Sequence, residues 1–222
     1  MPKISFKKKL MDYTFIGKKN GVAPIKATKK RTEALFVALI GAILFFLPVF
    51  SVLGQTWTET QPAGDVDKVW YAVASDSDGS NLIAGGYNML YISNDGGNSW
   101  TETKPAGELY SDWLRVASDS DGSNLIAGSY GGRIYISNDS GNSWTETQPA
   151  GSVNKTWWGV ASDSDGSNLI AGVNGGRLYI SNDSGTSWTE TQPAGSVNKG
   201  WQNMASNSDG FNLIAGANLG RL

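Results

Sequence analysis

The sequence contains no cysteine and no histidine. The absence of cysteine excludes disulfide bonds, and the absence of both residues excludes zinc sites built from cysteine and histidine ligands. It also excludes every catalytic pair in which a histidine activates a serine or cysteine nucleophile. Glycine, with 28 residues, and tryptophan, with nine, are abundant by contrast. Many turns combined with large apolar side chains favour an all-β chain of short strands.

Charge is unevenly distributed along the chain. Residues 1–33 carry a net charge of +8, whereas residues 55–222 carry a net charge of −10. An acidic body would repel phosphate groups, so we expect no nucleic-acid partner. The basic head is better explained by membrane topology.

Residues 34–54 form an apolar run without a single charge, long enough to cross a bilayer as a helix. The positive-inside rule keeps the basic segment 1–33 in the cytoplasm and places the body, residues 55–222, outside the membrane. We therefore predict one N-terminal hydrophobic helix that contacts the membrane through residues 34–54. Val52 and Gly54 also fit the spacing of a signal-peptidase site. A secreted protein and a single-pass membrane-anchored protein both stay open.

A repeat of 43 or 44 residues fills the chain from about Trp57 onward. The segment SWTETKPAG at 99–107 recurs almost unchanged at 143–151 and 187–195. Each unit holds four short runs with strand character, bounded by turn residues. In the second unit these runs are residues 113–117, 124–128, 133–137 and 143–148. Four strands in this length make one blade of a β-propeller.

We predict about three complete four-stranded antiparallel blades, together with partial ones. Residues 56–64 match a lone fourth strand, and the last unit stops in mid-blade. Three interpretations follow from these two pieces. They form a composite blade, or the sequence is incomplete, or two copies complete one ring as a homodimer.

The hairpin between the third and fourth runs matches S-x-D-x-G-x-x-W at 93–100, 137–144 and 181–188. This is the Asp-box pattern, and three copies in register on a blade-sized repeat are a specific signal. Residues 56–222 therefore resemble the Asp-box (BNR) propellers. That group includes sialidases, sortilin-type receptors, xyloglucanases, photosystem II assembly factors of propeller type and bacterial surface proteins. The resemblance implies that these turns lie away from any active site.

We expect the residues of the box to build the turn. The aspartate accepts hydrogen bonds from N–H groups of the turn, the glycine adopts a positive φ, and the tryptophan packs between sheets. The twelve residues are Ser93, Asp95, Gly97, Trp100, Ser137, Asp139, Gly141, Trp144, Ser181, Asp183, Gly185 and Trp188.

A second repeated turn, Asp76-Ser77-Asp78-Gly79, invites comparison with a calcium-binding loop. An EF-hand loop needs a glutamate at its twelfth position. With Gly79 as the sixth residue, the twelfth is Gly85, so the match fails. We favour a simple hairpin turn, and we expect neither a metal site nor a cofactor.

The copies differ from one another in two kinds of link. One joins a fourth strand to the next first strand, and the other joins a second strand to a third. In an antiparallel blade both links lie at the same end, opposite the two constant hairpins. We call these ends the variable end and the constant end. Loops on a rigid scaffold commonly carry function, so we expect the variable end to bind an unknown protein or carbohydrate ligand. Neutral drift in tolerant loops is the alternative.

Unmatched residues at the variable end are the candidate contacts. Trp158 has Tyr71, Leu114 and Gln202 at the equivalent positions, and Arg115 has no arginine equivalent. A third candidate is the repeated cationic position that starts the third strand. Its arginines would bind an anionic ligand or, as we favour, form ion pairs with nearby aspartates. The full set of hypothetical ligand-binding residues is Trp158, Arg115, Tyr71, Arg133, Arg177 and Arg221.

An enzyme is the less favoured alternative. A sialidase-like glycoside hydrolase of this type would need an arginine triad, and the usual Arg-Ile-Pro motif is missing. Glycoside hydrolysis also needs two carboxylates across a cleft. Asp67 and Asp112 lie in the variable links, but nothing selects them, so we assign no catalytic residue. A purely structural surface repeat is the third possibility, because such arrays lengthen and shorten easily.

Overall fold

A computed structural model describes residues 56–107 and 111–218. Within these ranges the chain forms strands and turns and no helix, which confirms the all-β prediction for this part. None of the described segments is a helix long and apolar enough to cross a membrane. The predicted hydrophobic helix at 34–54, the basic segment 1–33 and Arg221 all lie outside the described residues.

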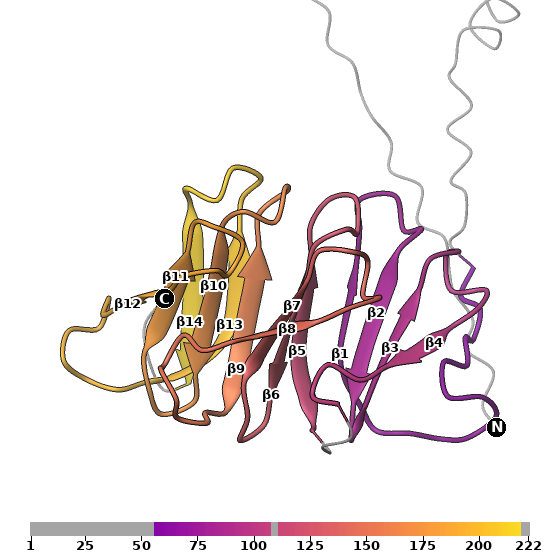
Figure 1. The fold of residues 1–222 in the computed structure, drawn as a ribbon, viewed down its shortest axis with the longest axis horizontal. Coiled ribbons are helices and arrows are strands. Elements are labelled where there is room, and N and C mark those ends of the chain that lie inside the picture. Colours follow the sequence, from indigo (N-terminus) through magenta and orange to yellow (C-terminus); the bar gives the residue numbers. More distant parts are fainter. Residues whose placement is uncertain (1–55, 108–110, 219–222) are drawn as a thin grey trace, which may run out of the picture. The chain divides into compact units, whose positions relative to one another are not determined.

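The described strands group into three four-stranded antiparallel sheets and a final two-stranded one, which we call blades 1 to 4 (Figure 1). Blade 1 is β1 (Trp70–Ser75), β2 (Leu82–Gly86), β3 (Met89–Ser93) and β4 (Thr101–Thr103). Blade 2 is β5 (Trp113–Ser118), β6 (Leu125–Ser129), β7 (Ile134–Ser137) and β8 (Thr145–Thr147). Blade 3 is β9 (Trp157–Ser162), β10 (Leu169–Val173), β11 (Leu178–Ser181) and β12 (Thr189–Thr191). Blade 4 is described as β13 (Gly200–Ser206) and β14 (Leu213–Asn218).

The hydrophobic core lies between blades. Strand side chains alternate between two faces, and each face packs on a different neighbour. Ile83 and Leu90 of blade 1 share one cluster with Trp113 and Val116 of blade 2. The same arrangement recurs between blades 2 and 3 and between blades 3 and 4. Each pair of consecutive repeats therefore shares one interface.

The periodic tryptophan that begins each first strand is the anchor of this interface. Trp157 is 1% exposed, and its ring meets that of Tyr179 edge to face, with centroids 5.7 Å apart. The Trp157 Cβ lies against Gly128 of the preceding blade, where an added Cβ would be only 2.9 Å from it. Gly85 has the same relation to Trp113. The glycine of the repeated LIAG run is thus required by close packing of neighbouring blades.

The structure corrects two expectations about the incomplete blades. Residues 56–64 do not form the predicted fourth strand, because none of the described strands lies beside them to complete a backbone ladder. They also do not join β13 and β14, which remain a two-stranded sheet among the described residues. Thr60 instead contacts blade 1, where its hydroxyl donates a hydrogen bond of 2.8 Å to the Gly97 carbonyl. Within residues 56–107 and 111–218, a composite blade is therefore not formed.

Candidate functional site

Each of the three S-x-D-x-G-x-x-W turns at the constant end is closed by the same pattern of hydrogen bonds. In the turn of blade 2, the Asp139 carboxylate accepts hydrogen bonds from the Ser137 hydroxyl and from the Ser143 amide, both at 2.8 Å. The Ser143 hydroxyl donates a further bond of 2.6 Å. The Gly141 amide in turn donates to the Ser137 hydroxyl, and Gly141 has a φ of 82°. The turn is thus closed by its own side chains.

The tryptophan of each turn reaches the preceding blade. The Trp188 Nε1–H donates to the Thr147 hydroxyl at 2.8 Å, and Trp144 donates to Thr103 in the same way at 2.9 Å. Trp100, in blade 1, donates to the Thr60 hydroxyl instead. These contacts fasten each turn to the fourth strand of the blade before it, or to the segment in that place.

The hydrogen bonds that close the turns lower the pKa of Asp95, Asp139 and Asp183, with the bond from the following serine hydroxyl as the main cause. A lowered folded-state pKa means that the carboxylate stabilises the fold fully above its unfolded pKa of about 3.9. The stabilisation is lost as the pH falls through the folded value, because the unfolded chain takes up the proton first.

We therefore expect the urea midpoint of the full chain to fall as the pH drops below about 4, and to fall less in Asp139→Asn than in the wild type. The measurement is urea unfolding followed by tryptophan fluorescence across this pH range. Asp65→Asn, in an exposed linker outside any box turn, is the matched control. An unchanged pH profile in Asp139→Asn would contradict this account.

At the variable end, the two kinds of link bind one another. Gly132, in the link between β6 and β7, exchanges backbone hydrogen bonds of 3.0 and 2.9 Å with Lys155, which precedes β9. Gly176 and Lys199 repeat this pair one blade further on. The Tyr87 amide likewise donates to the Val69 carbonyl at 3.0 Å. The variable segments therefore form one continuous end of the blades, as strand polarity predicted.

A β-bulge lies in the first strand of every blade, and it falls on the variable position that Trp158 occupies in blade 3. In blade 3, Trp157 pairs with Val173 and Gly159 with Gly172, so Trp158 is the extra residue. The same shift in register makes Tyr71, Leu114 and Gln202 the extra residues of the other blades. Bulges redirect side chains and are frequent beside binding sites. Sequence reasoning found these positions by their variation and missed the bulge, which leaves no residue signature.

Arg115 lies next to the bulge of blade 2 and is partly buried. Its Nη1 donates a hydrogen bond of 2.6 Å to the carbonyl of its own neighbour, Leu114. Burial lowers the pKa of Arg115, although an arginine stays charged at neutral pH. A cation held this way can bind a carboxylate or a carbonyl of a ligand.

Arg133 and Arg177 are held by their own blades. The Arg133 guanidinium donates to the Gly151 and Ser152 carbonyls, both at 2.7 Å, and its Nε lies 3.7 Å from a carboxylate oxygen of Glu146. Arg177 has the same relation to Glu190. The ion-pair partners are thus glutamates on the fourth strand and not the aspartates that we expected. Strand β7 pairs directly with β8, and Tyr135 lies opposite Glu146. Arg133 precedes Tyr135 by two residues and so lies on the same face of the sheet, which brings its guanidinium near Glu146.

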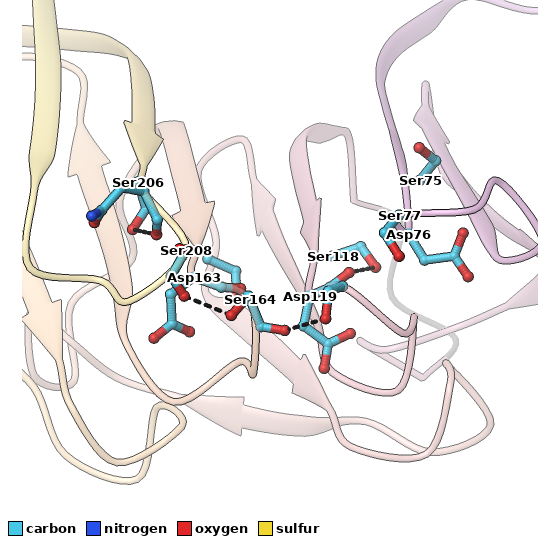
Figure 2. A pocket seen from close by; sticks show the side chains of 12 residues that line it. Ser75, Asp76, Ser77, Ser118, Asp119, Asp163, Ser164, Ser206 and Ser208 are labelled. Atoms are coloured by element: carbon cyan, nitrogen blue, oxygen red, sulfur yellow. Dashed lines mark hydrogen bonds between the residues drawn. The ribbon is translucent and has the colours of Figure 1, made fainter.

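A shallow hollow of about 240 Å³ lies at the constant end. It is lined where each first strand meets its hairpin turn, by the Ser-Asp-Ser runs of blades 1 to 3 and by Ser206, Asn207 and Ser208 of blade 4 (Figure 2). Burial opposes ionisation of Asp76, but hydrogen bonds from Asn81, Ser80 and Gly79 outweigh it and lower the pKa. The Asn124 and Asn168 side chains donate to Asp119 and Asp163 in the same way, so each of these carboxylates closes the turn from which it comes.

The remaining carboxylate candidates lie in the variable links. Asp112 accepts a hydrogen bond of 3.3 Å from the Asn88 amide, and Asp67 lies in the exposed link before β1. No group of three or more carboxylates within the described ranges is placed to hold a metal ion.

Comparison with solved structures identifies the architecture. An ancestral GH74 enzyme superposes with a TM-score of 0.56 at 18% sequence identity, over 68% of this chain and 24% of the enzyme. The blades are those of a β-propeller. YCF48 from Cyanidioschyzon merolae gives a TM-score of 0.49 at 18% identity, over 63% of this chain and 45% of that protein. A YCF48 bound to D1 peptide gives 0.48 at 16% identity, over 68% and 62%.

The chain thus spans about a quarter of the length of the GH74 propeller that it matches. At this identity the likeness concerns the fold alone. No protein-family model matches the sequence, and no curated protein matches it either.

Proposed function

We propose that this chain is an Asp-box propeller that acts as a ligand-binding or scaffolding module outside the cytoplasmic membrane. The apolar run 34–54, preceded by basic residues, supports export or membrane anchoring. The three self-closed S-x-D-x-G-x-x-W turns support the Asp-box assignment, because each builds a hairpin and fastens it to the preceding blade or, in blade 1, to the segment around Thr60.

One observation carries the binding proposal. The bulged position of every first strand holds a different residue in each copy, and it lies at the end of the blades where the two variable links meet. Tyr71 and Trp158 place aromatic surface there, and Arg115 lies on the adjacent first strand. Aromatic rings and an arginine are the side chains that dominate binding energy at protein surfaces. They also suit sugar rings and carboxylates, so the ligand is a protein segment or a glycan.

The constant end is a poorer candidate. The Ser-Asp-Ser residues there repeat from blade to blade, and their polar groups bind one another across blades.

At the variable end, Arg133 and Arg177 already bind Glu146 and Glu190 and backbone carbonyls. We propose them as secondary contacts, reached by a ligand that displaces the exposed glutamates.

The copies themselves supply the test variants. Trp158→Leu introduces the residue that blade 2 has at this position, and Arg115→Ala introduces the residue of blade 1. Phe211→Ser is the matched control, because Phe211 is exposed at the constant end, where the other copies have serine. All three changes therefore insert a residue that another blade of this chain already accommodates.

The experiment screens the full chain, in nonionic detergent, against an array of neutral and acidic glycans and a displayed peptide library. We expect Trp158→Leu and Arg115→Ala each to weaken the strongest interaction at least about tenfold, on the order of 1.4 kcal/mol. Phe211→Ser is expected to leave it unchanged. Binding that survives both variable-end changes and is lost in Phe211→Ser would overturn the proposal. Cleavage of an arrayed glycan would instead support a glycosidase.

A further inference from the structure

The interface between consecutive blades is built three times from equivalent positions of the repeat. The forward face of each blade presents the isoleucine of its LIAG run, and the rear face of the next blade presents the tryptophan of its first strand, beside a valine in blades 2 and 3 and beside Met204 in blade 4. Ile83, Ile126 and Ile170 are 1–3% exposed, and Val116 and Val160 are 8% exposed. The molecule thus contains repeated examples of one complementary pair of faces.

On the rear face of blade 1 and the forward face of blade 4, the equivalent residues are exposed to solvent. Val73, on the rear face of blade 1, is 75% exposed, and Trp70 beside it is 37% exposed. Ile214, on the forward face of blade 4, is 53% exposed. Each of these side chains is buried by a neighbouring blade in the internal copies. In the described part of the chain, the end faces are therefore the two halves of an interface that the internal blades form with one another.

Polar groups follow the same series. The Ser77, Ser120 and Ser164 amides each donate to the equivalent serine carbonyl of the next blade, at 3.0, 3.0 and 3.1 Å. The Asn81, Asn124 and Asn168 side chains also donate to a turn carbonyl of the next blade, at 3.0, 3.2 and 3.4 Å. Ser208 and Asn212 are the next members of these two series. Their counterparts on a following blade would be the Ser77 and Asp78 carbonyls.

We propose that a second copy of this chain docks its blade 1 onto blade 4, and that this contact reproduces the internal blade-to-blade interface. The forward face around Ile214 would cover the rear face around Val73 and Trp70 of the other copy. The contact is heterologous, since two different faces meet. It therefore leads to a closed ring of copies, of which a ring of two is the smallest, or to an open row of them.

The proposal is tested on the full chain in nonionic detergent by sedimentation velocity. Val73→Asp places a charge on the rear face, and Ile214→Asp places one on the forward face. Both positions are exposed in the single chain, so neither change disturbs its internal core. Val153→Asp is the matched control, because Val153 is 54% exposed in a link at the variable end.

We expect the wild type and Val153→Asp to associate, and Val73→Asp and Ile214→Asp each to sediment as monomers. An equimolar mixture of the two monomeric variants retains one intact rear face and one intact forward face. It should form one-to-one pairs and grow no further. A monomeric wild type, or association that persists in either face variant, would overturn the proposal.

A crosslink distinguishes a second copy from closure of one chain on itself. The chain has no cysteine, so introduced thiols report only on themselves. In a mixture of Ser77→Cys and Ser208→Cys chains, we expect a disulfide that joins one chain of each kind. In the Ser77→Cys/Ser208→Cys double variant, the same pairing should give chain-to-chain products. A disulfide formed within single chains only would overturn the proposal in favour of intramolecular closure.

Discussion

Replacement of Trp157 by alanine is expected to lower the free energy of unfolding by about 3–5 kcal/mol. The side chain is 1% exposed and packs between blades 2 and 3, against Gly128 on one side and the Tyr179 ring on the other. Its Nε1–H also donates a hydrogen bond to the Gly132 carbonyl at 3.2 Å. The change therefore removes packing on two blades and leaves a cavity between them.

The matched control is Trp57→Ala. Trp57 is 94% exposed, so its removal should change stability by no more than about 0.5 kcal/mol. Chemical denaturation of the full chain, followed by far-UV circular dichroism, measures both. Equal losses from the two substitutions would show that the periodic tryptophans are not interface anchors.

Replacement of Gly141 by alanine is expected to cost on the order of 2–4 kcal/mol. One part of this cost is the backbone, because Gly141 has a φ of 82° and an L-residue is strained there. The other part is packing, because an added Cβ would lie 2.8 Å from the Ile92 Cγ2 in blade 1. That methyl group is fixed by the branched side chain and cannot swing away.

Gly151→Ala separates the two contributions. Gly151 has a φ of 68°, but a Cβ there would meet no heavy atom within 4 Å. We expect this variant to lose only the backbone part, about 1–2 kcal/mol. Thermal unfolding of both variants beside the wild type gives the comparison. A loss from Gly151→Ala as large as that from Gly141→Ala would show that blade-to-blade packing at the box turn adds nothing.

Much of the blade could be predicted from the sequence, because the repeat supplies its own internal comparison. The four strand candidates of the second unit match β5 to β8 to within a few residues. Turn residues bound each strand, and the polarity of antiparallel strands places both variable links at one end. The structure adds the Gly132–Lys155 pair that joins these links.

Other features could not be predicted, since they depend on neighbours in space. The segment around Thr60 looks like its fourth-strand siblings in sequence, yet a strand needs a partner ladder. The bulge at Trp158 follows from the register of β9 against β10, which no residue type marks. The pairing of Arg133 with Glu146 follows from the register of β7 against β8. The local sequence thus predicts the strands of a blade. The bulge, the ion pair and the fate of the Thr60 segment depend on strand register and on the adjacent blade.

The two ends of the blades differ in how many of their residues are fixed by hydrogen bonds and strand pairing. At the constant end, hydrogen bonds run within turns and between blades, so replacing a residue that makes these bonds disturbs folding. At the variable end, the bulged residue can change between tyrosine, leucine, tryptophan and glutamine without altering the strand register. Such a position can acquire a binding role at little cost to stability.

The central claim is that consecutive repeats form blades stacked on one another in a fixed order, and amide hydrogen exchange of the full chain tests it most directly. The Ser120 and Ser164 amides have their acceptors in the next blade. We predict that both exchange far more slowly than in an unstructured peptide, as do amides of the central strands such as Ala127. Slow exchange at Ala127 with unprotected Ser120 and Ser164 amides would mean that blades form without this stacking, and would contradict the account.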